Sequence, residues 1–156
     1  MDSRRLVRIA LDEAPPPPSA YAEADRRQAV EDLLRGNTFD PAGLGPGPFS
    51  LHLMVREGRL VLDIRDGEDR PLRAIILVLG PFRRLIKDYH MLVEKHEEAV
   101  TAGAMDARVQ AIDMGRRGLH NEAAELLITR LEGRVAVDFE TARRLFTLIA
   151  ALHARV

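Results

Sequence analysis

Residues 111–122 carry the densest set of reactive side chains in this sequence, in the string AIDMGRRGLHNE. The polar members of this segment are Asp113, Arg116, Arg117, His120, Asn121 and Glu122. Guanidinium groups bind carboxylates and phosphates through paired hydrogen bonds, and an imidazole can exchange a proton near neutral pH. The segment could therefore bind an anion or, with His120 as the one natural general base, support acid–base chemistry.

Two backbone conformations fit this segment. At about 100° per residue, the apolar residues from Val109 to Leu131 stay on one face through both glycines, which indicates one continuous helix with the polar groups beside its apolar face. Alternatively, the helix breaks near Gly118. Asn121 would then lie at a new helix start, where free backbone N–H groups can hold an anion.

Two interpretations of the polar groups follow. In the first, Arg116 and Arg117 grip a carboxylate or phosphate of a ligand or partner, and His120 or Asn121 orients it. In the second, Asp113, Arg117 and His120 form a buried structural network that locks the helices together, because charges aimed at a core need partners. Structural networks of this kind are more common than functional sites, so the functional interpretation needs evidence beyond the presence of these residues.

Further arginine pairs occur early in two other predicted helices. These basic residues are Arg83, Arg84 and Lys87 in one helix and Arg143 and Arg144 in the other. If the three helices pack side by side, these cations could surround residues 116–117 and form an anion-binding cluster. The competing interpretation is a set of solvated surface charges, which contribute little to stability.

Metal and cofactor sites have little support in the sequence. His90, Glu94 and Glu97 share helical spacing, but no HExxH motif is present, and His96 lies on an apolar stripe typical of a core histidine. The glycines of residues 43–48 alternate with prolines, which lack N–H donors, and no strand precedes them. We therefore predict neither a metal nor a cofactor.

Composition narrows the possible partners and the location. The 156 residues carry a net charge of −1 and only 4% aromatic residues, which disfavours nucleic-acid binding. No cysteine is present, the N-terminus lacks an apolar signal region, and the longest apolar run is too short to span a bilayer. These features predict a cytoplasmic protein without membrane association.

The N-terminal half should consist mostly of sheet with one helix. We expect an edge strand at Leu6–Leu11, a stiff proline-rich tether at 14–19, a helix at Ala20–Arg35, and a loop at 37–48 that could act as a flap. Alternating residues then predict a hairpin around Glu57-Gly58. Residues 72–79 are apolar on both faces, so this third strand of the antiparallel meander should be the most buried.

The C-terminal half, from residue 80, should be helical. Gly80-Pro81 starts one helix, a second runs to Gly133, and Asp138 caps a third that ends near residue 154. The fold class is therefore α+β, a single domain over residues 1–156 in which 4–79 are mostly sheet and 80–156 helical. The last helix is apolar around much of its circumference, which predicts burial against a second subunit in a homodimer.

Three strings together resemble a small uncharacterised bacterial protein family of the UPF0262 type: PFRRLIKDY at 81–89, AIDMGRRGLHNE at 111–122, and VDFETARRLFTL at 137–148. The resemblance extends over most of the chain, although the proline run at 15–18 is not part of it. It implies a cytoplasmic bacterial setting and supplies no activity, cofactor or partner.

The sequence leaves two functions in contention. The first is a non-enzymatic regulatory or adaptor protein, self-associating, whose Arg-rich helical surface binds a protein partner or an acidic ligand. The alternative is a small enzyme or ligand-binding protein for a phosphorylated or carboxylated metabolite. Because no complete catalytic set is present, we expect the protein to be non-enzymatic.

Overall fold

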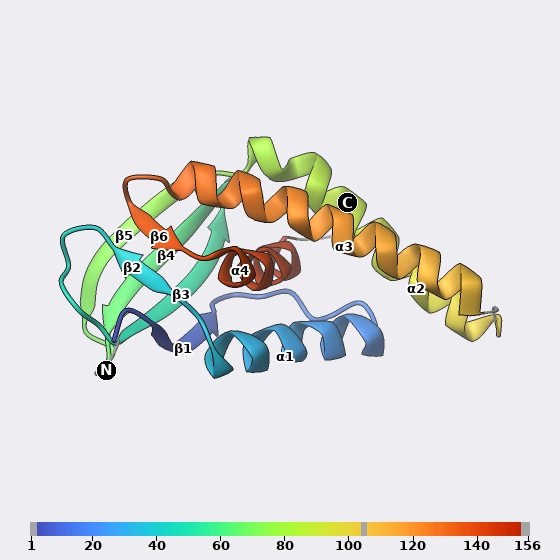
Figure 1. Cartoon of the computed structure of the whole chain (residues 1–156), viewed down its shortest axis with the longest axis horizontal. Helices are drawn as coiled ribbons and strands as arrows, with labels where there is room; N and C mark the ends of the chain where they lie inside the picture. Colours follow the sequence, from blue (N-terminus) through green and yellow to red (C-terminus); the bar gives the residue numbers. More distant parts are fainter. Residues whose placement is uncertain (1–2, 104–105, 154–156) are drawn as a thin grey trace.

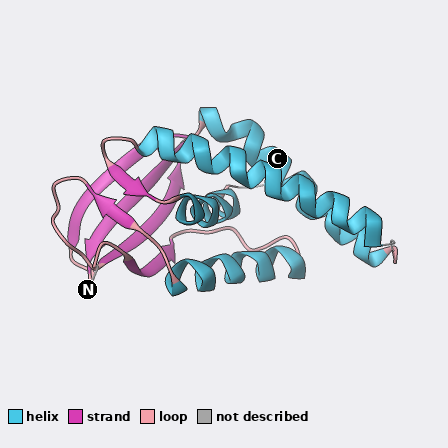
Figure 2. Ribbon diagram, viewed as in Figure 1, coloured by secondary structure: helices cyan, strands magenta, loops and turns pink. Residues whose placement is uncertain are grey.

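The computed structural model describes residues 3–103 and 106–153. Within these residues it contains four α-helices, a sheet of four strands and a small sheet of two strands. The predicted α+β class is therefore confirmed. Figure 1 and Figure 2 show the strands gathered at one end of the molecule, with two long helices extending away from them.

The larger sheet has the strand order β1 (Leu6–Leu11), β3 (Phe49–Arg56), β4 (Arg59–Asp66) and β5 (Pro71–Val78). β1 lies at the edge, as predicted, and pairs with β3 in parallel, so the sheet is mixed. A parallel pair needs a long crossover connection, and the segment with α1 provides it. The strands β3, β4 and β5 form the predicted antiparallel meander.

The β3–β4 hairpin shows why this part of the prediction holds. Arg56 pairs with Arg59, which leaves Glu57 and Gly58 as a two-residue turn, and both have positive φ angles of 51° and 73°. That backbone matches the twist of the flanking strands. Alternation then directs one set of side chains into the core, including Leu51, Leu53, Leu60, Leu62 and Ile64.

The expected burial of the third strand is wrong. β5 is the other edge strand, and the side chains on its outer face are exposed, with 42% for Leu72, 52% for Ile76 and 64% for Val78. The apolar residues of this strand are therefore not buried on both faces of the sheet. On the free edge, Arg134 Nη1 donates to the carbonyl oxygen of Ile76 at 3.3 Å, which blocks part of the edge against pairing.

The segment 37–48 is not entirely a loop. It contains β2 (Phe39–Pro41), which pairs antiparallel with β6 (Val135–Val137), a strand almost a hundred residues later. Only this distant partner makes the three residues a strand, and local sequence gives no sign of it. The pairing ties the end of the first helix to the start of the last.

The helices begin and end close to the predicted residues. α1 (Ala20–Arg35) starts at Ser19, whose Oγ accepts from the Ala22 N–H at 3.1 Å, and α4 (Phe139–Leu152) starts at Asp138, whose carboxylate accepts from the Thr141 N–H at 2.8 Å. A short 3-10 turn, Gly80–Phe82, leads into α2 (Arg83–Thr101). α3 (Asp106–Leu131) follows as the longest helix.

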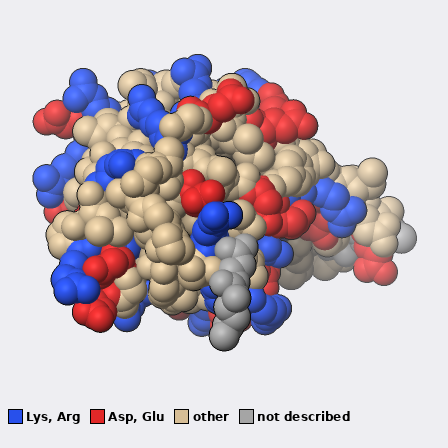
Figure 3. Space-filling model, turned by 60° about the vertical axis from the view of Figure 1, so that its left-hand side comes forward, with Lys and Arg blue, Asp and Glu red and all other residues tan. Residues whose placement is uncertain are grey.

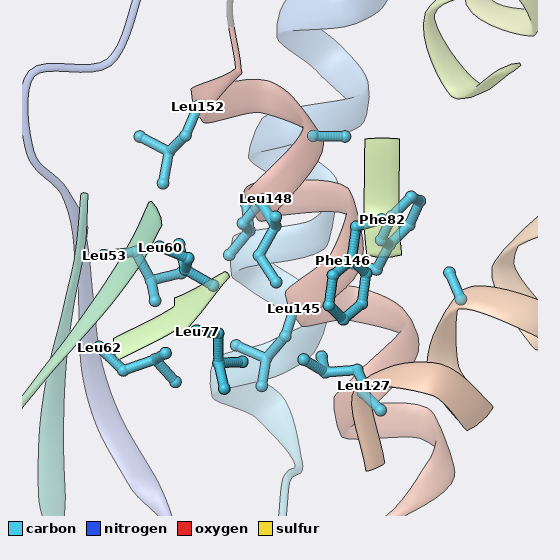
Figure 4. Packing of buried hydrophobic residues seen from close by; sticks show 14 of the residues in the cluster. Leu53, Leu60, Leu62, Leu77, Phe82, Leu127, Leu145, Phe146, Leu148 and Leu152 are labelled. Atoms are coloured by element: carbon cyan, nitrogen blue, oxygen red, sulfur yellow. The ribbon is translucent and has the colours of Figure 1, made fainter. Parts of the chain in front are cut away.

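α4 is the central helix of the molecule. In Figure 1 it is seen almost end-on, surrounded by α1, α3 and the sheet. Figure 4 shows Leu145, Leu148 and Leu152 directed toward leucines of the strands, and Phe146 beside Phe82 and Leu127. Its wide apolar circumference is therefore buried within its own chain, so α4 gives no support for a second subunit, and the homodimer stays a prediction.

Candidate functional site

A cleft of about 380 Å³ lies between α1, α3 and α4. It brings together four of the residues singled out in the 111–122 segment with the arginine pair of α4. Its lining side chains are Asp25, Gln28, Ala29, Asp32, Asp113, Arg116, Arg117, His120, Glu140, Arg143, Arg144 and Thr147.

α3 runs through Gly115 and Gly118 without interruption. The alternative conformation with a break near Gly118 is therefore wrong, and no helix N-terminus is available at Asn121 to hold an anion. In a continuous helix Asp113, Arg116, Arg117 and His120 fall on one side, since they are three or four residues apart. This spacing is what places them together in the cleft.

The main partner of Arg116 comes from α1, a helix that was not predicted to take part in the site. Arg116 Nη2 lies 2.9 Å from Asp25 Oδ1, and the side chains of the pair are 23% and 15% exposed. The hydroxyl of Tyr89 donates to the other oxygen of Asp25, and Arg116 also donates to the hydroxyl of Tyr21. Arg116 is thus held in an internal network.

This network keeps its members in definite charge states. Burial raises the pKa of the Tyr89 hydroxyl, and the negative charge of Asp25 raises it further. The pKa of Tyr21 is also raised, again chiefly by burial. Burial is the largest single effect on Arg116 and opposes its positive charge, but its acidic neighbours together, Asp25 first among them, outweigh burial, and the pKa of the guanidinium is raised overall. At neutral pH the tyrosines are neutral and Arg116 is charged.

His120 is buried, with 6% of the residue exposed. Its Nδ1 lies 2.8 Å from the carbonyl oxygen of Arg116, which can only accept, so Nδ1 carries the proton. Its Nε2 lies 2.9 Å from Thr147 Oγ1 and therefore accepts from that hydroxyl. Burial lowers the pKa of the ring, so His120 is a neutral residue with both nitrogens occupied.

The other arginines of the cleft make fewer or weaker contacts within the chain than Arg116 does. Among the described residues Arg117 makes no hydrogen bond or ion pair, and its side chain is exposed. Arg143 donates to the amide oxygen of Asn121, a neutral acceptor. Arg144 Nη2 lies 3.7 Å from the carboxylate of Glu140, one turn away. Arg117 and Arg143 are therefore the cations best able to receive an external anion.

Only part of the predicted cluster of cations lies around residues 116–117, namely Arg143 and Arg144. Arg84, a residue of α2, faces a different side of α3 from the cleft. There it pairs with Asp88 of its own helix and donates to Glu122 of α3. Arg83 and Lys87 are exposed and do not line the cleft. Of the two interpretations of these pairs, convergence on the cleft is wrong for Arg83, Arg84 and Lys87, and Arg83 and Lys87 are surface charges. The predicted network from Asp113 to Arg117 and His120 is also wrong, since the observed network is centred on Asp25.

Carboxylates balance the charge of the cleft. Four of its lining residues are arginines and four are acids, namely Asp25, Asp32, Asp113 and Glu140. Figure 3 likewise shows basic and acidic side chains interspersed on one face of the molecule. A ligand would be held by direct contact with particular arginines, since no broad positive field draws it in.

The carboxylates of α1 are the site residues that sequence reasoning missed. Asp25, Gln28 and Asp32 lie on one face of α1, beside the buried residues Ala29 and Leu33. Polar groups that border the buried stripe of a helix are the only local signal for such a role. Which helix they would meet depends on the tertiary fold.

The described residues offer neither a metal site nor a membrane-spanning helix. No group of three or more His, Asp or Glu side chains in the described residues could hold a metal ion. None of the helices in the described part of the chain is long and apolar enough to cross a membrane. The flap expected at 37–48 contributes no residue to the lining of the cleft.

Comparison with known proteins places the chain among uncharacterised bacterial sequences. The model of a family described as uncharacterised protein family UPF0262 matches residues 3–155. A UPF0262 protein of Granulibacter bethesdensis is 53% identical, covering 99% of this chain and 92% of the relative. One of Acidiphilium cryptum is 54% identical over 97% and 93%, and one of Agrobacterium fabrum 42% over 97% and 96%. No solved structure matches significantly.

Proposed function

Because the chain belongs to the uncharacterised family UPF0262, we propose its function from the cleft itself: it is a non-enzymatic cytoplasmic binding protein that recognises a carboxylate or phosphate group. The anionic group belongs to an acidic ligand or to a protein partner, and its binding gives the protein a regulatory or adaptor role.

One observation carries this proposal. Arg117 and Arg143 face the same cleft from adjacent helices, and neither has a carboxylate partner in the described residues. The planar guanidinium presents paired donors that match the oxygens of a carboxylate or phosphate. The helices α3 and α4 fix the backbone positions of both residues on the same cleft before a ligand arrives.

The state of His120 supports binding over catalysis. A small enzyme would need a group that exchanges a proton with its substrate, and His120 is the only imidazole among the lining residues. Its Nε2 is bonded to Thr147 and its Nδ1 to the backbone, so neither nitrogen is free to meet a substrate. Thr147 is engaged by the same bond and is not an activated nucleophile.

Isothermal titration calorimetry with inorganic phosphate and with small di- and tricarboxylates tests the proposal. For any anion that binds, we expect the substitution Arg117→Ala to lower the affinity by about 10- to 100-fold. The reason is that a charge-assisted hydrogen bond contributes about 1.5–3 kcal/mol.

Arg130→Ala is the matched control, since Arg130 is an exposed residue of the same helix and does not line the cleft. This variant should bind like the wild type. The proposal fails if no anion binds at millimolar concentration, or if the Arg117 and Arg130 variants are equally affected.

A further inference from the structure

The helices α2 and α3 form an antiparallel hairpin that extends beyond the rest of the molecule (Figure 1). Along one side of the hairpin runs a groove of about 370 Å³ whose apolar floor consists of Met91, Leu92, Gly115 and Leu119. Met91 is 44% exposed, and the nearby Met114 is 70% exposed. No element of the described chain covers these side chains.

The side of α2 that borders this groove carries a regular pattern. Arg84, Asp88, Met91, Lys95 and Glu98 are separated by four, three, four and three residues, which is the heptad spacing of helices that pack along their length. All five belong to one stripe of the helix. Its charges alternate in sign on either side of the methionine.

This stripe is complementary to itself when reversed. If a second α2 lies antiparallel with Met91 opposite Met91, then Asp88 faces Lys95 of the partner subunit and Arg84 faces Glu98 of the partner subunit. Each of these pairs occurs twice, as a two-fold axis requires. Opposite charges at flanking positions specify partner and orientation in paired helices.

Three of the four charges are available for such contacts as they stand, while Arg84, which already pairs with Asp88 and Glu122, would have to exchange a partner for Glu98 of the partner subunit. Lys95 and Glu98 are exposed, and their side chains make no hydrogen bond or ion pair with the described residues. Asp88 bonds to Arg84 at 3.1 Å through one carboxylate oxygen, so its other oxygen can accept from Lys95 of the partner subunit. Gly115, which lines the groove, has no side chain to fill the space beside Leu92.

We propose that this protein forms a two-fold symmetric dimer in which α2 packs antiparallel against α2 of a second copy, centred on Met91. Residues 115 and 117 point to different sides of α3, because they lie about 200° apart around the helix. The dimer therefore uses another side of the hairpin than the anion-binding cleft, and the two proposals stand or fall separately.

Site-specific cross-linking tests the position of the axis. The chain has no cysteine, so Met91→Cys introduces a single thiol. Under mild oxidation we expect this variant to form a disulfide-linked dimer at micromolar concentration. Val78→Cys, at an exposed position of β5, is the control and should stay largely monomeric on a denaturing gel. Equal cross-linking of both variants would overturn the proposal.

Charge reversal tests the pairing itself by sedimentation equilibrium of the full chain. Lys95→Asp places a carboxylate against Asp88 of the partner subunit and should raise the dimer dissociation constant at least tenfold. The double variant Asp88→Lys with Lys95→Asp restores opposite charges and should recover most of the affinity.

Circular dichroism confirms that each variant is folded. A wild-type chain that is monomeric at all accessible concentrations overturns the proposal. So does a dimer whose dissociation constant is the same for the wild type, the single variant and the double variant.

Discussion

Both ring nitrogens of His120 bond to neighbours within the chain, one to a backbone carbonyl and one to Thr147. The same ring packs edge to face against Tyr89 and Phe146, with centroid distances of 5.7 Å to each. His120 therefore joins α3 to α4 beneath the arginines of the cleft. The role of His120 in this segment is therefore structural, because it connects the two helices.

Replacement of His120 by Gln should change how stability depends on pH. Burial lowers the pKa of the ring in the folded state. Above about pH 6.5 the ring is neutral in both the folded and the unfolded chain, so it adds no pH dependence. As the pH falls below that value, the unfolded chain takes up a proton that the folded chain resists, and the free energy of unfolding decreases.

Thermal unfolding between pH 7.5 and pH 5 measures this effect. The wild type should lose melting temperature more steeply with acid than His120→Gln, although the variant is less stable at pH 7 by about 1–3 kcal/mol through altered buried hydrogen bonds. Parallel curves for the two proteins would show that His120 is not held neutral.

At the scale of elements, α3 determines where the cleft residues lie. It continues through two glycines, each of which weakens a helix interior by about 0.5–1 kcal/mol relative to alanine. A Cβ atom at Gly118 would meet nothing within 4 Å outside the local helix backbone. No close contact in this chain therefore requires a glycine at this position.

Gly118→Ala should stabilise the protein by about 0.5–1 kcal/mol, because it removes the entropic cost of a glycine in a helix without a clash. Chemical denaturation measures the difference. Gly133→Ala is the contrasting variant and should destabilise, since Gly133 has a φ angle of +82° after the helix ends. A loss of stability in Gly118→Ala would contradict a regular helix at this position.

Local patterns predicted most of the elements. The alternation in Phe49–Arg56, the proline of the 3-10 turn that leads into α2 and the cap at Asp138 each depend on residues only a few positions apart. Pairing between distant segments was not predictable. The parallel partner of β1, the β2–β6 pair and the edge position of β5 depend on which segments meet, and residue periodicity does not contain that information.

The candidate site divides in the same way. The spacing of Asp113, Arg116, Arg117 and His120 correctly predicted that they share one side of a helix. It could not show that Arg116 would form an ion pair with Asp25, or that Arg84 would bond to Glu122 outside the cleft. Those contacts are made across 91 and 38 residues of chain and follow from the helix packing.

For the whole molecule, we propose that one mixed-charge cleft binds an anionic group while the rest of the surface does not. The net charge of −1 and the interspersed charges in Figure 3 give little general attraction for anions. Selectivity must then come from Arg117 and Arg143, which are positioned by α3 and α4. A uniform response of the surface to an anion would be inconsistent with this claim.

The most direct test is a titration of the isotope-labelled protein with inorganic phosphate, followed through backbone amide and arginine Nε–H signals at constant ionic strength. We expect saturable shifts confined to residues 113–121 and 140–147, with Arg117 and Arg143 most affected and Arg83 and Lys87 unchanged. Shifts that are absent, that do not saturate, or that centre on Arg83, Arg84 and Lys87 would contradict this expectation.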